Sequence, residues 1–505
     1  MSAIDDQKPP RLAFGMYKRF ALGALLITLA CSGAVATAGL LEVNELVSIV
    51  RNEGHTIPGL QGALDDVPDG KPQTILVLGS DRRFVDIKQD NPARSDTIML
   101  VRLDPSKAAT AVLSIPRDLK AAIHVPGGGV QVTKINAAYS YGGPALTVKT
   151  VRRLMGIKIN HVVNVNFGGF RRAVNRLGCV YVDVDRHYFH SNAGLPPSEQ
   201  YAEINIPAGY QKLCGKRSLD YVRFRHDDDD LVRSARQQDF LRQAKDQIGL
   251  GRIFGDRKEL LKIFARYTDT DIHSTSATLQ LLKLAFQSSG HPIREVHFGG
   301  NVGPEYVTIS RSALRKVRNE FLEVKASSGE RPVGSSATRS ATRATKRAVR
   351  RHSHGLSAFG LMSDRTRAED YVAQASTHLR YPLYYPRVRL LRGSYIGQGP
   401  RVYSIKDTAH QRHRSYRMVL STGLVGQYYG VQGTSWKAPP ILDDPSDKVR
   451  MRGRAYQLFY DGSRLRLVAM RTPKAVYWVS NSLSETLSNK QMLSIARSLS
   501  RVGDR

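Results

Sequence analysis

The sequence predicts an α/β fold: a central mixed sheet flanked by helices, preceded by an N-terminal transmembrane helix and followed by a smaller C-terminal α+β domain. From residue 73 to about residue 325, apolar strand-like runs alternate with segments of helical periodicity, which is typical of a layered α/β domain. A chain of 505 residues is longer than one hydrophobic core usually covers. We therefore expect two or three folded units.

The transmembrane helix is predicted over residues 21–41, where 21 consecutive positions carry no charge, enough to span a bilayer. Basic residues precede this run, namely Arg11, Lys18 and Arg19. The positive-inside rule then leaves residues 1–20 in the cytoplasm and exports everything after residue 41. A cleaved signal peptide is the alternative, because Ala34-Val35-Ala36 has the pattern of a cleavage site. The apolar run is longer than a usual signal core and favours a retained anchor.

The formal net charge of +31 favours anionic partners: nucleic acid, an anionic membrane or a phosphate-rich polymer. Charge alone does not choose among them, and much of it can be solvated surface. Export of the chain after residue 41 argues against nucleic acid, and the sequence contains no recognisable DNA-reading motif. We therefore expect no nucleic-acid partner.

Polar motifs adjoin the first predicted strands of the α/β domain, at residues 74–78, 97–101 and 110–113. These motifs are GSDR at 79–82, RSDT at 94–97, SIPRD at 114–118 and, further on, KINAAY at 134–139. In an open α/β sheet, loops at the carboxyl ends of strands bind ligands. Arginine binds phosphate oxygens bidentately, and hard divalent cations take carboxylate oxygens. The motifs therefore predict a site for a phosphorylated compound.

Further elements follow the same alternation. Residues 42–72 are a juxtamembrane segment that becomes rich in Gly, Pro and Asp. Strands are predicted at 161–167 and 180–184, and helices at 170–177, 236–248, 259–264 and 279–286.

The ordered set GSDR, RSDT, SIPRD, KINAAYSYGG, FGGFRRAVNRLG, YVRFRH and RSARQQ resembles the LytR-CpsA-Psr family of cell-wall glycopolymer transferases. The similarity covers roughly residues 73–325. Each motif is short, and their common order and spacing carry the resemblance. It implies a membrane-anchored phosphotransferase that moves a glycopolymer from a polyprenyl-pyrophosphate carrier onto a peptidoglycan sugar hydroxyl.

The resemblance also implies roles for individual residues. The implied catalytic set is Asp81, Arg94, Asp96 and Arg117. Asp81 and Asp96 would hold Mg²⁺ (or Mn²⁺) against the pyrophosphate, because magnesium commonly binds through one or two carboxylates and substrate phosphate oxygens. The alternative is that these aspartates occupy turn or cap positions. Either one could deprotonate the attacking hydroxyl.

The residues implied to bind substrate are Arg82, Lys134, Asn136, Arg223, Arg225, Arg233, Arg236 and Gln237. Arg223 and Arg225 would share one face if residues 221–225 are extended. The acidic run Asp227–Asp230 stays outside the predicted site, as a solvated loop that can hold neighbouring arginines in place.

Two further features of this domain leave alternatives open. Cys179 and Cys214 are a possible disulfide in an exported domain, or else two buried thiols. A long isoprenoid needs an apolar groove, although core packing is the simpler account of each candidate lining residue. These candidates are Ile248, Leu250, Ile253, Phe254, Leu260, Leu261, Ile263, Phe264, Leu279, Leu281, Leu282 and Phe286.

Residues 326–364 are predicted to be a basic flexible linker, dominated at first by Ser, Thr, Ala, Arg and Lys. Residues 365–505 form the predicted C-terminal α+β accessory domain. Alternating apolar residues on either side of Asp461-Gly462 predict a hairpin, and Ser488 with Gln491 predicts a capped helix. Aromatic residues of this domain could stack on sugars or pack in its core: Tyr384, Tyr385, Tyr428, Tyr429 and Trp436.

The expected partners are a polyprenyl-pyrophosphate-linked glycan, peptidoglycan and the lipid bilayer. The expected location is the cell membrane, as a single-pass protein with a cytoplasmic N-terminus and its catalytic domain outside. Three alternatives remain: a hydrolase of polyprenyl-pyrophosphate glycans, a non-catalytic wall-binding adaptor, and a membrane-bound transcriptional attenuator. Export argues against the last of these.

Overall fold

The computed structural model describes residues 48–49, 55–60, 62–68, 70–80, 95–107, 109–196, 200, 202–224, 230–248, 256–272, 274–288, 293–324, 355–373 and 375–503. The predicted transmembrane helix, most of the predicted linker and the segment 81–94 lie outside these residues. No helix among the described residues has both the length and the apolar character needed to cross a bilayer.

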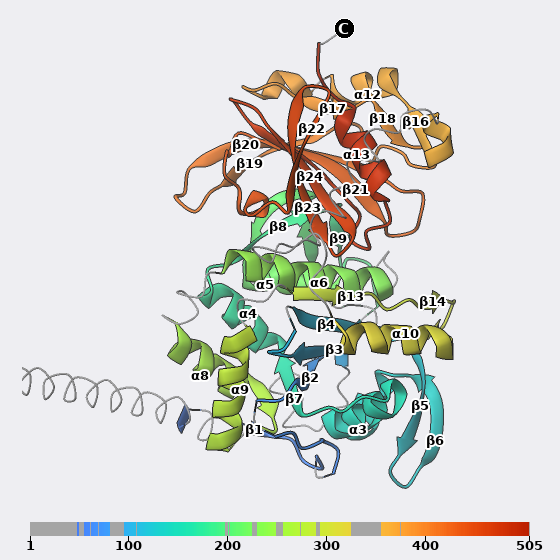
Figure 1. Ribbon diagram of the computed structural model, residues 1–505, viewed down its shortest axis with the longest axis vertical. Helices are drawn as coiled ribbons and strands as arrows, with labels where there is room; N and C mark the ends of the chain where they lie inside the picture. The colour runs from blue at the N-terminus through green and yellow to red at the C-terminus, as the bar shows by residue number, and fades with distance from the viewer. Residues whose placement is uncertain are drawn as a thin grey trace, which may run out of the picture.

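A seven-stranded sheet organises the first part of the chain, in the lower half of Figure 1. In order across the sheet, its strands are β1 (His55–Thr56), β12 (Thr268–Thr270), β7 (His161–Asn166), β2 (Gln73–Ser80), β3 (Ser95–Leu103), β4 (Thr110–Ile115) and β13 (Ile293–Val296). β2 pairs antiparallel with β3 and parallel with β7. The predicted central mixed sheet is therefore confirmed.

Alternating apolar residues along β2 contribute to two layers. Leu76 and Leu78 belong to a buried core shared with α3 (Ala137–Met155) and α10 (Arg311–Leu322). Ile75 and Val77 belong to a separate cluster with α8 (Arg257–Tyr267) and α9 (Thr275–Ser288). Because successive strand residues point to opposite faces, helices flank both sides of the sheet, as predicted. Most apolar side chains of the second cluster are only half-buried.

A layer that contains the disulfide lies between this sheet and the C-terminal part (Figure 1). It comprises α4 (Phe167–Arg176), α5 (Gly215–Arg223), α6 (Asp230–Gln247) and the antiparallel strands β8 (Val180–Val184) and β11 (Gly209–Leu213). The strand and helix predicted at 180–184 and 170–177 are confirmed. The disulfide joins Cys179, just before β8, to Cys214, just after β11. It therefore closes one end of the β8–β11 pair.

The C-terminal part is β-rich. Its seven-stranded antiparallel sheet runs in the order β19 (Arg401–Lys406), β20 (Arg412–Ser421), β21 (Tyr428–Thr434), β25 (Val476–Ser480), β24 (Arg464–Arg471), β23 (Arg454–Asp461) and β22 (Asp447–Met451). Helices α12 (Arg365–Val372) and α13 (Asn489–Arg497) pack on one face. The predicted β23–β24 hairpin is present, and Ser488 and Gln491 form the predicted capping box of α13.

The structured C-terminal part begins earlier than the predicted boundary at residue 365. A short 3₁₀ helix, η1 (Leu356–Phe359), leads into β16 (Leu361–Ser363), which pairs with β18 (Val388–Leu390). Leu361 is buried in the C-terminal core. The linker prediction extended too far because this short strand has too few residues to show a periodic pattern.

The other face of the C-terminal sheet packs directly on the β8–β11 pair. Tyr181 and Tyr210 share a buried cluster with Tyr403, Trp436 and Trp478 of the C-terminal part. The Tyr403 hydroxyl donates to the Tyr210 carbonyl at 3.0 Å. The two parts are therefore joined by one continuous apolar core, and Trp436 is a packing residue of that core.

Two more of the aromatic residues that could have bound sugars, Tyr385 and Tyr429, are fully buried in the C-terminal core.

Candidate functional site

The ends of four strands meet at one edge of the first sheet. β2 ends at Ser80, which pairs with Ser95 at the start of β3 and with Asn166 at the end of β7. β4 ends at Ile115, which pairs with Ile98 of β3. The GSDR, RSDT and SIPRD motifs therefore adjoin the same edge, as the sequence predicts.

A β-bulge marks this edge between β2 and β3. Gly79 pairs with Thr97 and Ser80 with Ser95, so Asp96 is an extra residue on β3. A Cβ atom at Gly79 would lie 2.9 Å from the Thr97 Cβ, and the close approach of the strands therefore requires glycine. The Ser80 hydroxyl is buried and has no hydrogen-bond partner among the described residues.

Four of the predicted site residues cannot be located relative to this bulge. Asp81, Arg82, Arg94 and Arg225 lie outside the described residues. Asp96 is described as part of β3 but without its side chain. Chain connectivity alone puts Asp81 directly after Ser80.

Arg117 and Lys134 gather around one carboxylate. The Arg117 Nε atom lies 3.6 Å from Asp118 Oδ1, and the Lys134 Nζ atom lies 3.3 Å from the same oxygen. Backbone hydrogen bonds hold the turn: Leu119 donates to the Pro116 carbonyl, and Asn136 donates to the Arg117 carbonyl at 3.2 Å. The structure thus brings SIPRD and KINAAY together, as predicted.

The first turn of α6 adds a second carboxylate to this cluster. Asp230 Oδ1 lies 3.9 Å from Arg117 Nε and forms an ion pair with Arg233. Its other oxygen accepts a hydrogen bond from the Asp118 backbone at 3.4 Å. Asp230 thus does hold neighbouring arginines in place, although it begins a helix and is not part of a solvated loop.

Asp118 and Asp230 were missed as site residues by the sequence analysis. The available signals were the adjacency of Asp118 to Arg117 and the three-residue helical spacing between Asp230 and Arg233. We name Arg117, Asp118, Lys134, Asp230 and Arg233 together the charged cluster.

Gln237 connects α6 to the bulge. Its Nε2 atom donates to the Thr97 hydroxyl at 3.2 Å and to the Val222 carbonyl at 3.1 Å. Thr97 follows Asp96 directly, so Gln237 links the helix of Arg233 to the strand of Asp96. The structure therefore brings Gln237 to the site edge, as predicted.

Asn136 lies beside this cluster at the N-terminus of α3. It is buried, and its side chain makes no capping hydrogen bond to the helix. Tyr139 packs nearby and accepts a hydrogen bond from Asn164 at 3.0 Å.

Two other predicted arginines that the structure describes, Arg223 and Arg236, make contacts outside the charged cluster. Residues 221–223 are the end of α5, so the condition under which Arg223 and Arg225 would share one face of an extended segment is not met there. The guanidinium of Arg223 lies over the Phe167 ring, 5.1 Å from its centre. Arg236 is fully buried, donates to the Phe224 carbonyl at 2.7 Å and lies over the Tyr188 ring. These contacts give Arg236 a structural role.

The model of the LytR_cpsA_psr family matches residues 45–320. The chain belongs to this family. The match contains the bulge and the whole charged cluster, and it ends before the C-terminal part.

Two curated relatives support this membership. Polyisoprenyl-teichoic acid–peptidoglycan teichoic acid transferase TagT of Bacillus subtilis is 31% identical over 225 residues, which are 43% of this chain and 66% of TagT. An uncharacterised protein of Staphylococcus aureus is 35% identical over 178 residues, which are 35% of this chain and 42% of that protein. The chain therefore spans less than two thirds of the length of each of these relatives.

Among solved structures, the crystal structure of Bacillus subtilis TagV aligns with 51% of this chain and 98% of that chain. The sequence identity is 27% and the TM-score is 0.39.

Proposed function

We propose that this protein transfers a glycopolymer, with its phosphate, from a polyprenyl-pyrophosphate carrier to a sugar hydroxyl of peptidoglycan. The observation that carries the proposal is the charged cluster beside the bulge, where three basic side chains converge. Family membership supports it, since the TagT relative is named as a teichoic acid transferase acting on peptidoglycan.

The proposed reaction makes one bond to phosphorus and breaks another. The acceptor hydroxyl oxygen attacks the phosphorus that carries the glycan, and the bridging P–O bond of the pyrophosphate breaks. Polyprenyl phosphate leaves with the bonding electrons, and the hydroxyl proton passes to a base. Catalysis of phosphoryl transfer rests mainly on positioning and on electrostatic stabilisation of the developing charge.

The charged cluster suits these requirements. Arg117, Lys134 and Arg233 can each neutralise phosphate oxygens, and Arg117 and Arg233 present fixed guanidinium planes. Asp118 and Asp230 orient these side chains before substrate binds. Such preorganised cations need little rearrangement as charge moves onto the leaving phosphate.

A divalent cation is proposed at the bulge, held by Asp81 and Asp96. The buried Ser80 hydroxyl lies at the bulge and has no hydrogen-bond partner among the described residues. A polar ligand bound there could supply that partner. No group of three or more His, Cys, Asp or Glu side chains suited to a metal occurs in the described part of the chain. Magnesium needs only one or two carboxylates beside substrate phosphate oxygens. When bound, it would neutralise pyrophosphate charge.

The isoprenoid part of the carrier is proposed to lie against the cluster of α8 and α9. That face of the sheet keeps several apolar side chains half-buried: Val77, Leu103, Val165, Phe264 and Leu281. Covering them with an isoprenoid would remove apolar surface from water, at about 25 cal/mol per Å².

The proposed location is the outer face of the cell membrane, with residues 21–41 as the anchor. The apolar sequence of this segment supports the anchor. The disulfide between Cys179 and Cys214 supports an oxidising compartment outside the cytoplasm.

To test the proposal, the full-length protein in detergent is incubated with a synthetic polyprenyl-pyrophosphate oligosaccharide, magnesium and peptidoglycan fragments. The products are identified by mass spectrometry. We expect a glycan-phosphate adduct on peptidoglycan that is lost on chelation and in Arg117→Ala. The matched control is Arg153→Ala, which removes an exposed arginine of α3. Polyprenyl phosphate without any adduct would indicate hydrolysis, and full activity of a folded Arg117→Ala protein would refute the proposal.

A further inference from the structure

Helix α6 contributes side chains both to the candidate site and to the boundary with the C-terminal part. Its first turns carry Asp230, Arg233 and Gln237 of the candidate site. Its second half carries Asp239, Arg242 and Gln243, which line the boundary with the C-terminal part. Asp230 and Arg242 are twelve positions apart, or about 18 Å along one continuous helix. A displacement of the second half therefore moves the first half with it.

Arg242 is the main polar contact of α6 at this boundary. Its guanidinium lies 3.0 Å from Glu295 Oε1 of β13 and 2.7 Å from Asp461 Oδ2 of the C-terminal part, and it also pairs with Asp239. All three carboxylates belong to buried residues. One cation thus joins α6, the edge of the first sheet and the C-terminal hairpin.

Asp461 reaches Arg242 from the turn of the β23–β24 hairpin. The same carboxylate lies 3.6 Å from the Arg294 guanidinium of β13. The next residue, Gly462, has a φ of +57°, and a Cβ atom there would overlap the present position of the Arg294 guanidinium. The positive φ favours glycine at this turn. The hairpin turn therefore contacts both β13 of the first sheet and helix α6.

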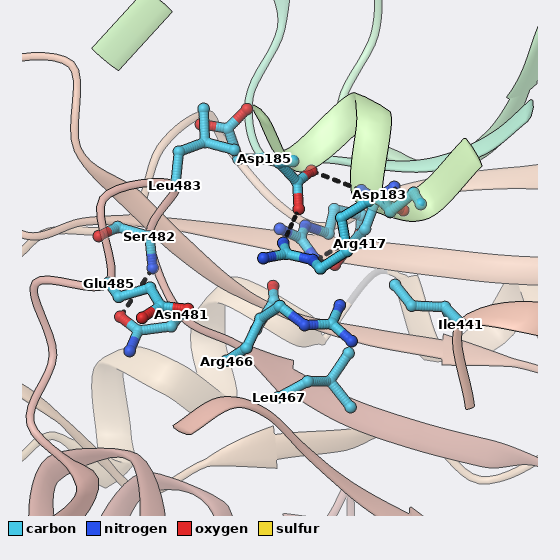
Figure 2. A pocket seen from close by; sticks show the side chains of 14 residues that line it. Asp183, Asp185, Arg417, Ile441, Arg466, Leu467, Asn481, Ser482, Leu483 and Glu485 are labelled. Carbon is cyan, nitrogen blue, oxygen red and sulfur yellow. Dashed lines mark hydrogen bonds and ion pairs between the residues drawn. The ribbon is translucent and has the colours of Figure 1, made fainter. Parts of the chain in front are cut away.

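Apolar packing does not fill the space beside these ion pairs. A cavity of about 30 Å³ separates α6 from the C-terminal sheet, lined by Asp239, Arg242 and Gln243 on one side. Arg417, Arg466 and Glu485 also line it (Figure 2), and Arg417 pairs there with Asp183 at 3.0 Å. Ion pairs and hydrogen bonds thus contribute to holding α6 at this level, beside the cavity.

From this geometry we infer that Asp461 is a positioning residue: through Arg242 it fixes α6, and thereby Asp230, Arg233 and Gln237, at the candidate site. The C-terminal part then completes the arrangement of the charged cluster, in addition to any contact with the wall. The inference rests on the proposed function only for the ligand used in its test.

The test compares full-length wild type, Asp461→Asn and Asp461→Ala. Asp447→Asn is the matched control, because it makes the same charge change at the start of β22 on the same sheet. The first measurement is backbone hydrogen exchange of residues 230–238. The second is the affinity for polyprenyl pyrophosphate without acceptor. We expect faster exchange and an affinity loss of roughly tenfold in both Asp461 variants, and neither change in the control.

A purely structural role of Asp461 makes a different prediction. It would lower the melting temperature while exchange of residues 230–238 and affinity stay at the wild-type values, and that result would overturn the inference. If wild type does not bind polyprenyl pyrophosphate, the proposed function fails and the exchange measurement alone decides the inference. Unchanged exchange in a folded Asp461→Ala protein would then refute it.

Discussion

Asp230 holds two arginines of the candidate site with one carboxylate, so its charge orients both of them. Asp230→Asn keeps the size of the side chain and removes the charge. We expect a fall in kcat/KM for polymer transfer on the order of tenfold to a hundredfold, because Arg117 and Arg233 lose their common anchor. Glu259→Gln, which breaks an exposed ion pair with Lys262, is the control and should leave kcat/KM unchanged.

Arg236 should behave differently from Arg233, although the two are one turn apart. It is fully buried against aromatic rings and donates to the Phe224 carbonyl. We expect Arg236→Ala to lower the free energy of unfolding by about 2–4 kcal/mol, measured by urea denaturation. Arg223→Ala is the comparison, with a loss below about 1 kcal/mol. Equal losses in the two variants would contradict this assignment.

The contacts of charged side chains were predictable from the sequence where both partners lie in the recognised motifs. SIPRD and KINAAY contain Arg117, Asp118 and Lys134, which do meet. The burial of Arg236 was not predictable, because Tyr188 lies 48 positions earlier in the chain and nothing local links the two. In a chain with many basic residues, the sequence around one arginine does not indicate whether its side chain is buried.

At the scale of elements, periodicity predicted β8, α4 and α13, whose patterns run over several residues without interruption. Alternating apolar and basic residues at 221–225 left an extended segment open, whereas residues 221–223 end helix α5. The start of α6 was missed because consecutive aspartates are typical of a solvated loop. In the structure, an aspartate in the first helical turn also complements the helix dipole.

The β8–β11 pair should depend on its disulfide. The bridge spans 35 positions of sequence, and closing a loop of that length stabilises a fold by about 2–4 kcal/mol in the chain-entropy model. We expect the Cys179→Ser/Cys214→Ser double variant to lose that amount in urea denaturation. A reductant should destabilise wild type and leave the double variant unchanged. A destabilising effect of reductant on the double variant would assign the loss to another cause.

At the scale of the whole molecule, the linker between the two parts suggested independent domains, but their surfaces form one core. Tyr181 and Tyr210 are buried in one cluster with Tyr403, Trp436 and Trp478. The sequence could not reveal this interface, since most of its members belong to strands whose apolar pattern each sheet explains on its own. Contacts between distant segments leave no periodic signal.

The buried acids at the interface predict a pH dependence of stability. Burial, with the nearby charges of Asp461 and Asp239, raises the pKa of Glu295 to about 8, against the lowering effect of Arg242. The folded state thus holds this proton more tightly than the unfolded chain. The contribution of protonated Glu295 to the free energy of unfolding is complete below pH 4.5, falls as pH rises and is lost above about pH 8.

We therefore expect the stability difference between wild type and Glu295→Gln to shift in favour of the variant between pH 5 and pH 8. The measurement is the melting temperature of both proteins across this range. Parallel curves for the two proteins would show that Glu295 does not titrate there. Asp447→Asn again serves as the control, with a curve parallel to wild type.

The hydrogen bond from Trp478 to Asp183 joins residues 295 positions apart, and it has a consequence for how the protein matures. Contacts so distant in sequence form late, because the intervening chain must first be made and closed into a loop. Under the proposed export, the tyrosines of the β8–β11 pair would lack this cover until the strand of Trp478 has crossed the membrane. A chain interrupted before residue 461 would contain every motif of its family and lack the hairpin that anchors α6. If Asp461 positions α6 as inferred, full affinity for the carrier would require that the β23–β24 hairpin has been made and has folded against α6.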